Sequence, residues 1–127
     1  MVGDGFAEAY PMPATMKDVS DLLDDLEPEI KFAFIERVHS SPQMGVRSAF
    51  SFGMNNGMLR AMLTSKEIPF DDATPQRWMK HLRCMTKGNK NVTKSKAQNM
   101  FPHLKITHKI ADALLIAEYC RQIRNNA

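Results

Sequence analysis

Three polar side chains, two of them carboxylates in apolar surroundings, have residue types that could do chemistry. Asp112 lies in the middle of the apolar run Ile110–Ala117. Burying an unpaired carboxylate costs free energy, so this side chain requires a cation, a metal ion or an open site beside it. His108 precedes Asp112 by four residues, which places both on one face of a helix. Glu36 is a second carboxylate in a similar setting, near the end of the apolar stretch Ile30–Val38.

Each carboxylate also has a purely structural interpretation. Asp112 could face solvent and pair with an arginine or a lysine, and Glu36 could pair with Arg37 or His39 at the edge of a sheet. Taken singly, either acid is about as consistent with such a pair as with a functional site. The presence of two acids in similar apolar settings favours one shared site.

Two elements must position these acids. The residues of Ile30–Val38 are nearly all apolar, as in a strand that is covered on both faces. Ligand sites in open α/β sheets gather at the carboxyl ends of strands, where Glu36 lies. The region from about Thr107 to Arg124 predicts a final helix that is buried on more than one face.

The intervening segments predict a scaffold of helices and short strands. A helix is expected over about Arg47–Lys66, and Gly53 and Gly57 within it would allow another backbone to approach closely. Its apolar side would comprise Phe50, Met54, Met58, Ala61 and Met62. A short strand follows over 68–73, and Thr74-Pro75 then begins a helix anchored by Trp78 and Leu82. A further short helix is expected over Lys94–Phe101.

The N-terminal part predicts one strand and one helix. Residues Phe6–Tyr10 alternate as in a short strand, and the turn signal Gly3-Asp4-Gly5 has no expected strand in front of it. Thr15 is placed to cap a helix that ends at Pro28. This helix is expected to act as scaffold.

Length and composition indicate one globular domain spanning residues 1–127. The chain is 43% hydrophobic and 24% charged, which is ordinary for a soluble protein and unlike a disordered one. No apolar run approaches the roughly 20 residues of a membrane span, and the start lacks the features of a signal peptide. Cys84 and Cys120 lie in helical apolar patterns, so packed thiols in a reducing, cytoplasmic compartment are expected.

The charge is strongly polarised along the chain. Acids dominate up to Glu36, whereas no acid occurs between Asp72 and Asp112. That interval instead carries many basic residues and the glycine-containing loop Thr86–Thr93, a candidate phosphate-contacting segment. A polyanion partner is the favoured explanation, and an ordinary solvated lysine-rich surface is the alternative. The basic residues of this interval are Arg77, Lys80, Arg83, Lys87, Lys90, Lys94, Lys96, Lys105 and Lys109.

Several motifs, in this order, resemble the RuvC-type Holliday-junction resolvases of the short phage and bacterial branch. Residues 34–40 (Phe-Ile-Glu-Arg-Val-His-Ser) are similar to the strand that carries the second catalytic carboxylate there. Residues 43–46 and 50–59 are similar to the loop and long helix that follow. The likeness continues in Ile68-Pro69-Phe70, Thr74-Pro75-Gln76-Arg77-Trp78, Lys94-Ser95-Lys96-Ala97 and residues 111–119. Together the motifs cover most of the chain from about Tyr10 onward.

The resemblance implies an RNase H-like, three-layer α/β fold and a homodimer that nicks four-way DNA junctions in recombination and repair. The activity would be that of a crossover junction endodeoxyribonuclease with Mg²⁺, or alternatively Mn²⁺. Glu36 and Asp112 fall on acidic metal-binding positions of the family. His108 or Lys109 occupies the remaining late position, and His108 is preferred because a charged lysine cannot bind a metal. Two metal ions roughly 4 Å apart would activate water and stabilise the leaving oxygen.

The expected DNA contacts are made by basic residues on and around the loop before the last two helices. They would meet backbone phosphates and not base edges. The expected residues are Arg77, Lys80, Lys87, Lys90, Lys94, Lys96 and Lys109.

The chain departs from the family pattern at its start. Family members begin with a strand that carries the first metal-binding aspartate, and Asp4 lies between glycines with no apolar strand ahead of it. The sheet is therefore expected to be truncated, with about three strands remaining, and the chain alone to be inactive if that aspartate is required. The alternatives are a non-catalytic DNA-binding module and an inactive dimeric remnant of such a nuclease.

Overall fold

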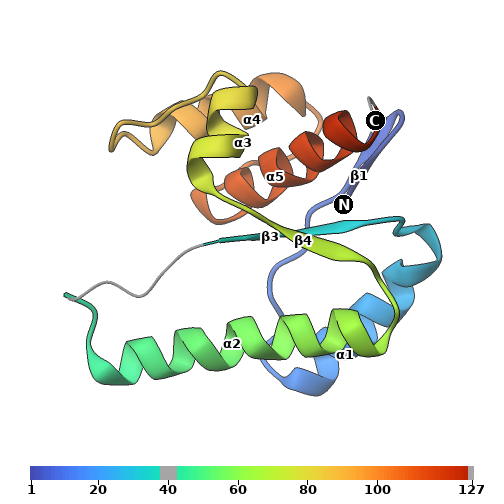
Figure 1. Ribbon diagram of the computed structural model, residues 1–127. Helices are drawn as coiled ribbons and strands as arrows, with labels where there is room; N and C mark the ends of the chain where they lie inside the picture. The colour runs from blue at the N-terminus through green and yellow to red at the C-terminus, as the bar shows by residue number, and fades with distance from the viewer. Residues whose placement is uncertain (38–42, 126–127) are drawn as a thin grey trace.

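The computed structural model describes residues 1–37 and 43–125 and has a mixed α/β architecture (Figure 1). Helices lie on both sides of a small parallel sheet in the middle of the molecule. In chain order the elements are β1 (Val2–Gly3), β2 (Phe6–Ala7), α1 (Met16–Leu26), the 3-10 turn Glu27–Glu29, β3 (Ala33–Glu36), α2 (Val46–Ser65), β4 (Phe70–Ala73), α3 (Pro75–His81), α4 (Asn91–Met100) and α5 (His108–Asn125).

The central sheet pairs β3 with β4 in parallel, from Ala33 opposite Phe70 to Glu36 opposite Ala73. The Arg37 N–H donates to the Ala73 carbonyl at 2.8 Å and extends the pairing by one residue. Parallel strands require a long crossover, which α2 supplies. Because α1 and α2 lie on one side of the sheet and α3, α4 and α5 on the other, the expected α/β class is confirmed (Figure 1).

The N-terminal hairpin corrects one sequence-based prediction. Val2–Gly3 forms a strand ahead of the turn and pairs antiparallel with Phe6–Ala7, so a strand does precede the second one. Gly5 closes the turn with φ of 81°, a conformation that glycine adopts without strain. The hairpin packs beside α5 and does not join β3 and β4. Within the described residues the central sheet therefore has two strands and not the expected three.

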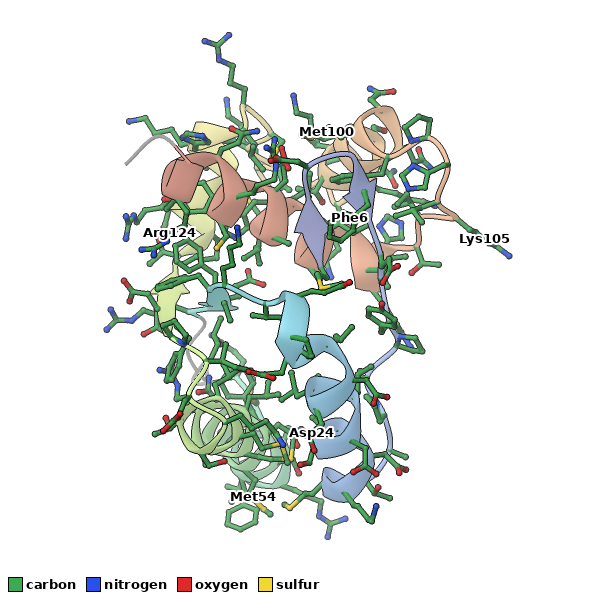
Figure 2. All side chains as sticks on the ribbon, turned by 90° about the vertical axis from the view of Figure 1, so that its right-hand side faces the viewer. Phe6, Asp24, Met54, Met100, Lys105 and Arg124 are labelled. Carbon is green, nitrogen blue, oxygen red and sulfur yellow. The ribbon has the colours of Figure 1, made fainter. Side chains whose placement is uncertain are left out.

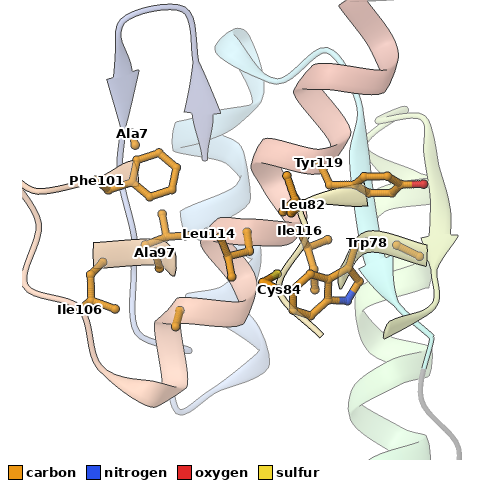
Figure 3. Packing of buried hydrophobic residues seen from close by; sticks show 13 residues of the cluster. Ala7, Trp78, Leu82, Cys84, Ala97, Phe101, Ile106, Leu114, Ile116 and Tyr119 are labelled. Atoms are coloured by element: carbon orange, nitrogen blue, oxygen red, sulfur yellow. The ribbon is translucent and has the colours of Figure 1, made fainter. Parts of the chain in front are cut away.

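The hydrophobic core lies between α3, α4 and α5, on one side of the sheet (Figure 3). Trp78, Leu114 and Leu115 are fully buried, and the Phe34 ring of β3 lies 5.7 Å from the Tyr119 ring of α5. The predictions of Trp78 and Leu82 as anchors, of packed thiols at Cys84 and Cys120, and of a final helix buried on several faces are confirmed. The nearly continuous apolar run 110–117 of this helix allows such burial.

The predicted starts of α1 and α3 agree with the structure, because a helix cap depends on only a few neighbouring atoms. The Thr15 hydroxyl accepts from the Asp18 N–H at 3.1 Å and caps α1, and the Thr74 hydroxyl accepts from the Arg77 N–H at 3.3 Å and caps α3. Helix α4 begins at Asn91, earlier than the predicted start at Lys94. At this start the Asn91 N–H donates to the side-chain oxygen of Asn89 at 3.0 Å.

Helix α2 corrects a second prediction. Phe50 and Met54, expected to be buried, are 68% and 47% exposed, and Figure 2 shows Met54 on the side of α2 away from the sheet. A Cβ on Gly53 or Gly57 would have no atom within 4 Å, so no backbone packs closely there. In the C-terminal half of α2, Arg60 pairs with Asp72 of β4.

A helix that crosses a membrane must be both long and apolar. None of the helices in residues 1–37 and 43–125 is both long enough and apolar enough to cross a bilayer.

Candidate functional site

The two acids singled out in the sequence converge. Glu36 is the last residue of β3, and Asp112 lies in the first turns of α5, which packs across β3. Burial raises the pKa of the Glu36 carboxyl above its ordinary value, and the nearby negative charge of Asp112 raises the pKa further. The tertiary structure therefore places two carboxylates, separated by most of the chain, within electrostatic reach of each other.

Neither carboxylate has a cationic partner within the described residues. No salt bridge in residues 1–37 and 43–125 involves Glu36 or Asp112, and Arg37 is exposed without pairing to Glu36. The proposed alternative of a pair with His39 concerns a residue outside the described ones. The charge of Asp112 raises the pKa of Glu36, so the two carboxylates repel each other, and such an arrangement favours binding of a cation.

The third predicted ligand does not join the two acids. His108 is the first residue of α5, Lys109 is the second, and both are exposed. In the part of the chain that the structure describes, no three His, Cys, Asp or Glu side chains form a group that could hold a metal ion. The role of His108 therefore stays a prediction from the resemblance.

Sequence reasoning predicted Trp78 only as an anchor of the core and did not anticipate its unpaired indole N–H. Its side chain is fully buried, and its Nε1 atom has no hydrogen-bond partner among the described residues. The indole N–H of Trp78 lowers the pKa of the Glu36 carboxyl, which partly offsets the effects of burial and of Asp112. No sequence signal could have found it, because the place of Trp78 relative to Glu36 depends on the β3–β4 register, which sets Ala73, five residues before Trp78, opposite Glu36.

Cys84 connects the acids to the basic side of the molecule. Burial raises the pKa of its thiol, Lys96 lowers that pKa, and Asp112 raises it. The charges of Asp112 in α5 and of Lys96 in α4 therefore both act on the pKa of this one buried thiol. Helix α4, which carries Lys96, also packs against α5, which carries Asp112.

A hollow of about 430 Å³ opens next to Cys84, between α4 and the segment that precedes it. Its wall is rich in hydrogen-bond donors and carries two cationic side chains but no acid. An anionic group such as a phosphate would find complementary charge and donors there. The lining residues are Arg83, Cys84, Asn89, Asn91, Val92, Ser95, Lys96 and Asn99.

None of the other predicted DNA-contacting residues lines this hollow. Arg77 and Lys80 are exposed on α3, and Lys87 and Lys90 are exposed in the connection to α4. Lys94 is half-buried on α4, and Lys109 is exposed at the start of α5. Arg83 lines the hollow although it was not among the expected DNA contacts. The hollow itself is the feature that sequence spacing did not reveal.

The donor set fits one Mg²⁺ ion better than two. Mg²⁺ is commonly held by one or two carboxylates, with waters and substrate phosphates completing its octahedral shell. Glu36 and Asp112 could supply two such carboxylates to one ion, with waters completing its shell.

No protein-family model matches the chain, and no curated protein matches it. The functional conclusion therefore depends on the geometry of the site and on the motifs of the sequence.

Proposed function

We propose that this chain is a metal-dependent endonuclease of the resolvase type, with an RNase H-like fold, which cuts phosphodiester bonds in four-way DNA junctions. The observation that carries the proposal is the convergence of Glu36 and Asp112 at the carboxyl end of β3, with no cationic partner among the described residues. A parallel strand pair with helices on both sides is consistent with this fold.

The two carboxylates would bind Mg²⁺, or alternatively Mn²⁺. A bound divalent ion supplies a Lewis acid that lowers the pKa of a coordinated water and stabilises charge on the phosphate. Glu36 and Asp112 would hold the ion, and His108 would assist by orienting a water or taking its proton, as the resemblance implies.

The substrate class follows from the charge beside the acids. Lys96 and Arg83 line a hollow free of acidic side chains, and the exposed basic residues of α3 and of the α3–α4 connection extend that surface. A DNA backbone would bind there through phosphate contacts, while an adjacent phosphodiester bond reaches Glu36 and Asp112.

A homodimer is the second part of the proposal. Val46, Phe50 and Met54 recur every four residues along one face of α2 and are 89%, 68% and 47% exposed. A second copy would cover this face, and a junction-cutting enzyme needs two sites to cut two strands. Phe50→Asp is expected to convert the dimer to a monomer in sedimentation experiments, with little effect on the circular dichroism spectrum.

The direct test is cleavage of a mobile four-way junction in Mg²⁺. Glu36→Gln and Asp112→Asn should each abolish cleavage and leave junction binding largely intact, because both changes remove a metal ligand while keeping the size of the side chain. Glu29→Gln is the matched control, since Glu29 is an exposed acid in the 3-10 turn. Cleavage that survives either site substitution would remove that residue from the proposed site.

A DNA-binding module without catalysis is the alternative function. The acid-free hollow at Lys96 and Arg83 favours it, because phosphate binding there requires no metal. Binding that weakens steeply with salt, without cleavage at any Mg²⁺ or Mn²⁺ concentration, would support this alternative over the nuclease.

A further inference from the structure

The indole nitrogen of Trp78 is a buried hydrogen-bond donor without an acceptor. Trp78 is the single tryptophan of the chain and is 0% exposed. Among the described residues, its Nε1 is the one fully buried side-chain nitrogen or oxygen that lacks a hydrogen-bond partner. Buried donors of this kind nearly always find a partner, so an unpaired one calls for a specific explanation.

The backbone around Trp78 holds this donor at the end of β3. Thr74 caps α3 directly after β4, so that Trp78 lies in the first turns of the helix. The preceding residue, Ala73, is opposite Glu36 in the sheet and accepts from the Arg37 N–H at 2.8 Å. Figure 3 shows the indole nitrogen of Trp78 on the side of the ring that faces β3.

Glu36 is the acceptor that this geometry offers. The half-buried Glu36 carboxyl belongs to the last residue of β3, opposite Ala73, and the helix that holds Trp78 begins directly after Thr74. A carboxylate has two oxygens, so one can accept a hydrogen bond while the other binds a cation. Groups that hold a metal-binding side chain in this way fix its orientation and commonly alter metal affinity by about 10- to 100-fold.

We infer that Trp78 is a positioning residue: when a divalent cation shared with Asp112 binds, its indole N–H donates to one oxygen of the Glu36 carboxylate and so holds the other oxygen toward that cation. The inference rests on the proposed function, because it assigns Glu36 to a cation site. Tryptophan suits this task since its N–H donates only and carries no charge that would compete for the site.

The lone indole N–H gives a direct readout of the inference. In ¹⁵N-labelled wild-type protein, its single NMR cross-peak should move downfield and exchange more slowly with water as Mg²⁺ is added. Glu36→Ala should abolish this movement. Mg²⁺ binding itself is measured in parallel by calorimetry, which requires no nuclease activity.

A pair of variants separates positioning from packing. Trp78→Phe keeps an aromatic ring but removes the N–H, and it should weaken Mg²⁺ affinity by about tenfold. Leu82→Ala is the control, because Leu82 is a buried neighbour in the same core. It should lower stability and leave Mg²⁺ affinity within about twofold of the wild-type value.

The outcomes distinguish failure of the positioning role of Trp78 from failure of the proposed cation site. If wild-type protein binds Mg²⁺ while the indole cross-peak stays in place, the positioning role is refuted and the cation site stands. That result requires no variant, so it holds even if Trp78→Phe fails to fold. If wild-type protein does not bind Mg²⁺ at all, both the positioning role and the proposed cation site are refuted.

Discussion

The substitution Glu36→Gln should change stability in opposite directions with and without Mg²⁺. In metal-free protein the Glu36 carboxylate is half-buried, faces the charge of Asp112 and has no cationic partner among the described residues. Removing its charge relieves both the desolvation cost and the repulsion. Solvent screening at this half-buried position limits the gain, so we expect the free energy of unfolding to rise by about 1 kcal/mol at pH 7 in EDTA.

In Mg²⁺ the wild-type protein should become the more stable of the two. A ligand that binds only the folded state adds RT ln(1 + [L]/Kd) to the free energy of unfolding, which is about 2.7 kcal/mol at 100 times Kd. Glu36→Gln loses one of two carboxylate ligands and should gain little from the same concentration. The variant is thus expected to be less stable than wild type by about 2 kcal/mol under these conditions.

Urea unfolding followed by Trp78 fluorescence and circular dichroism measures both values. Glu29→Gln is the control and should stay within about 0.5 kcal/mol of wild type in either buffer, because Glu29 is exposed. A variant that is less stable than wild type in EDTA would contradict the account of two repelling, unpaired carboxylates. Equal stabilisation of both proteins by Mg²⁺ would remove Glu36 from the cation site.

Three further predictions concern pH, salt and a buried ion pair. Because the pKa of Glu36 is raised in the folded state, the contribution of Glu36 to the stability of the metal-free protein should be greatest below its unfolded-state pKa and be lost as pH rises through the folded-state value; the wild-type minus Glu36→Gln difference across a pH series of urea titrations isolates this slope. Lys96→Ala should lower the salt dependence of DNA binding by about one unit of slope in fluorescence anisotropy, whereas Lys17→Ala, in the acidic N-terminal part, should leave it unchanged. Arg121→Met removes the 2.5 Å ion pair with Glu118, which is 5% exposed, and should cost about 2 kcal/mol of stability at pH 7 in thermal unfolding. Burial raises the pKa of Glu118, but the hydrogen bonds from Arg121 and Gln122 outweigh burial and leave the pKa lowered. The stability cost of Arg121→Met should therefore shrink as pH falls through the folded-state pKa of Glu118. A cost that does not change with pH would contradict this account of the ion pair.

The sequence predicted well wherever a few neighbouring residues decide the structure. Thr74 before Pro75 predicted the start of α3, and the apolar run around Asp112 predicted a helix buried on several faces. Both patterns act locally, through a cap in one case and through apolar residues on every side in the other. The position of Glu36 at the end of its strand was equally readable, although the strand β3 is shorter than its apolar stretch.

The sequence misled where distant segments decide what is covered. Phe50 and Met54 have the spacing of a buried helix face, yet they are exposed because the N-terminal turns of α2 extend past the elements that could cover them. The strand at Val2 is too short to show a pattern, and it became visible only through pairing with Ala7 and packing beside α5. Helical spacing reports that a face is apolar, and tertiary packing decides whether anything lies against it.

By itself the sequence determined the class of the fold and the two acids worth following, Glu36 and Asp112. Their adjacency, the basic hollow beside Cys84 and the unpaired indole N–H of Trp78 were decided only by the tertiary structure. The physical reason is that a carboxylate's electrostatic environment depends on atoms brought near it by the packing of α3 and α5 on β3, and spacing along the chain carries no record of those distances.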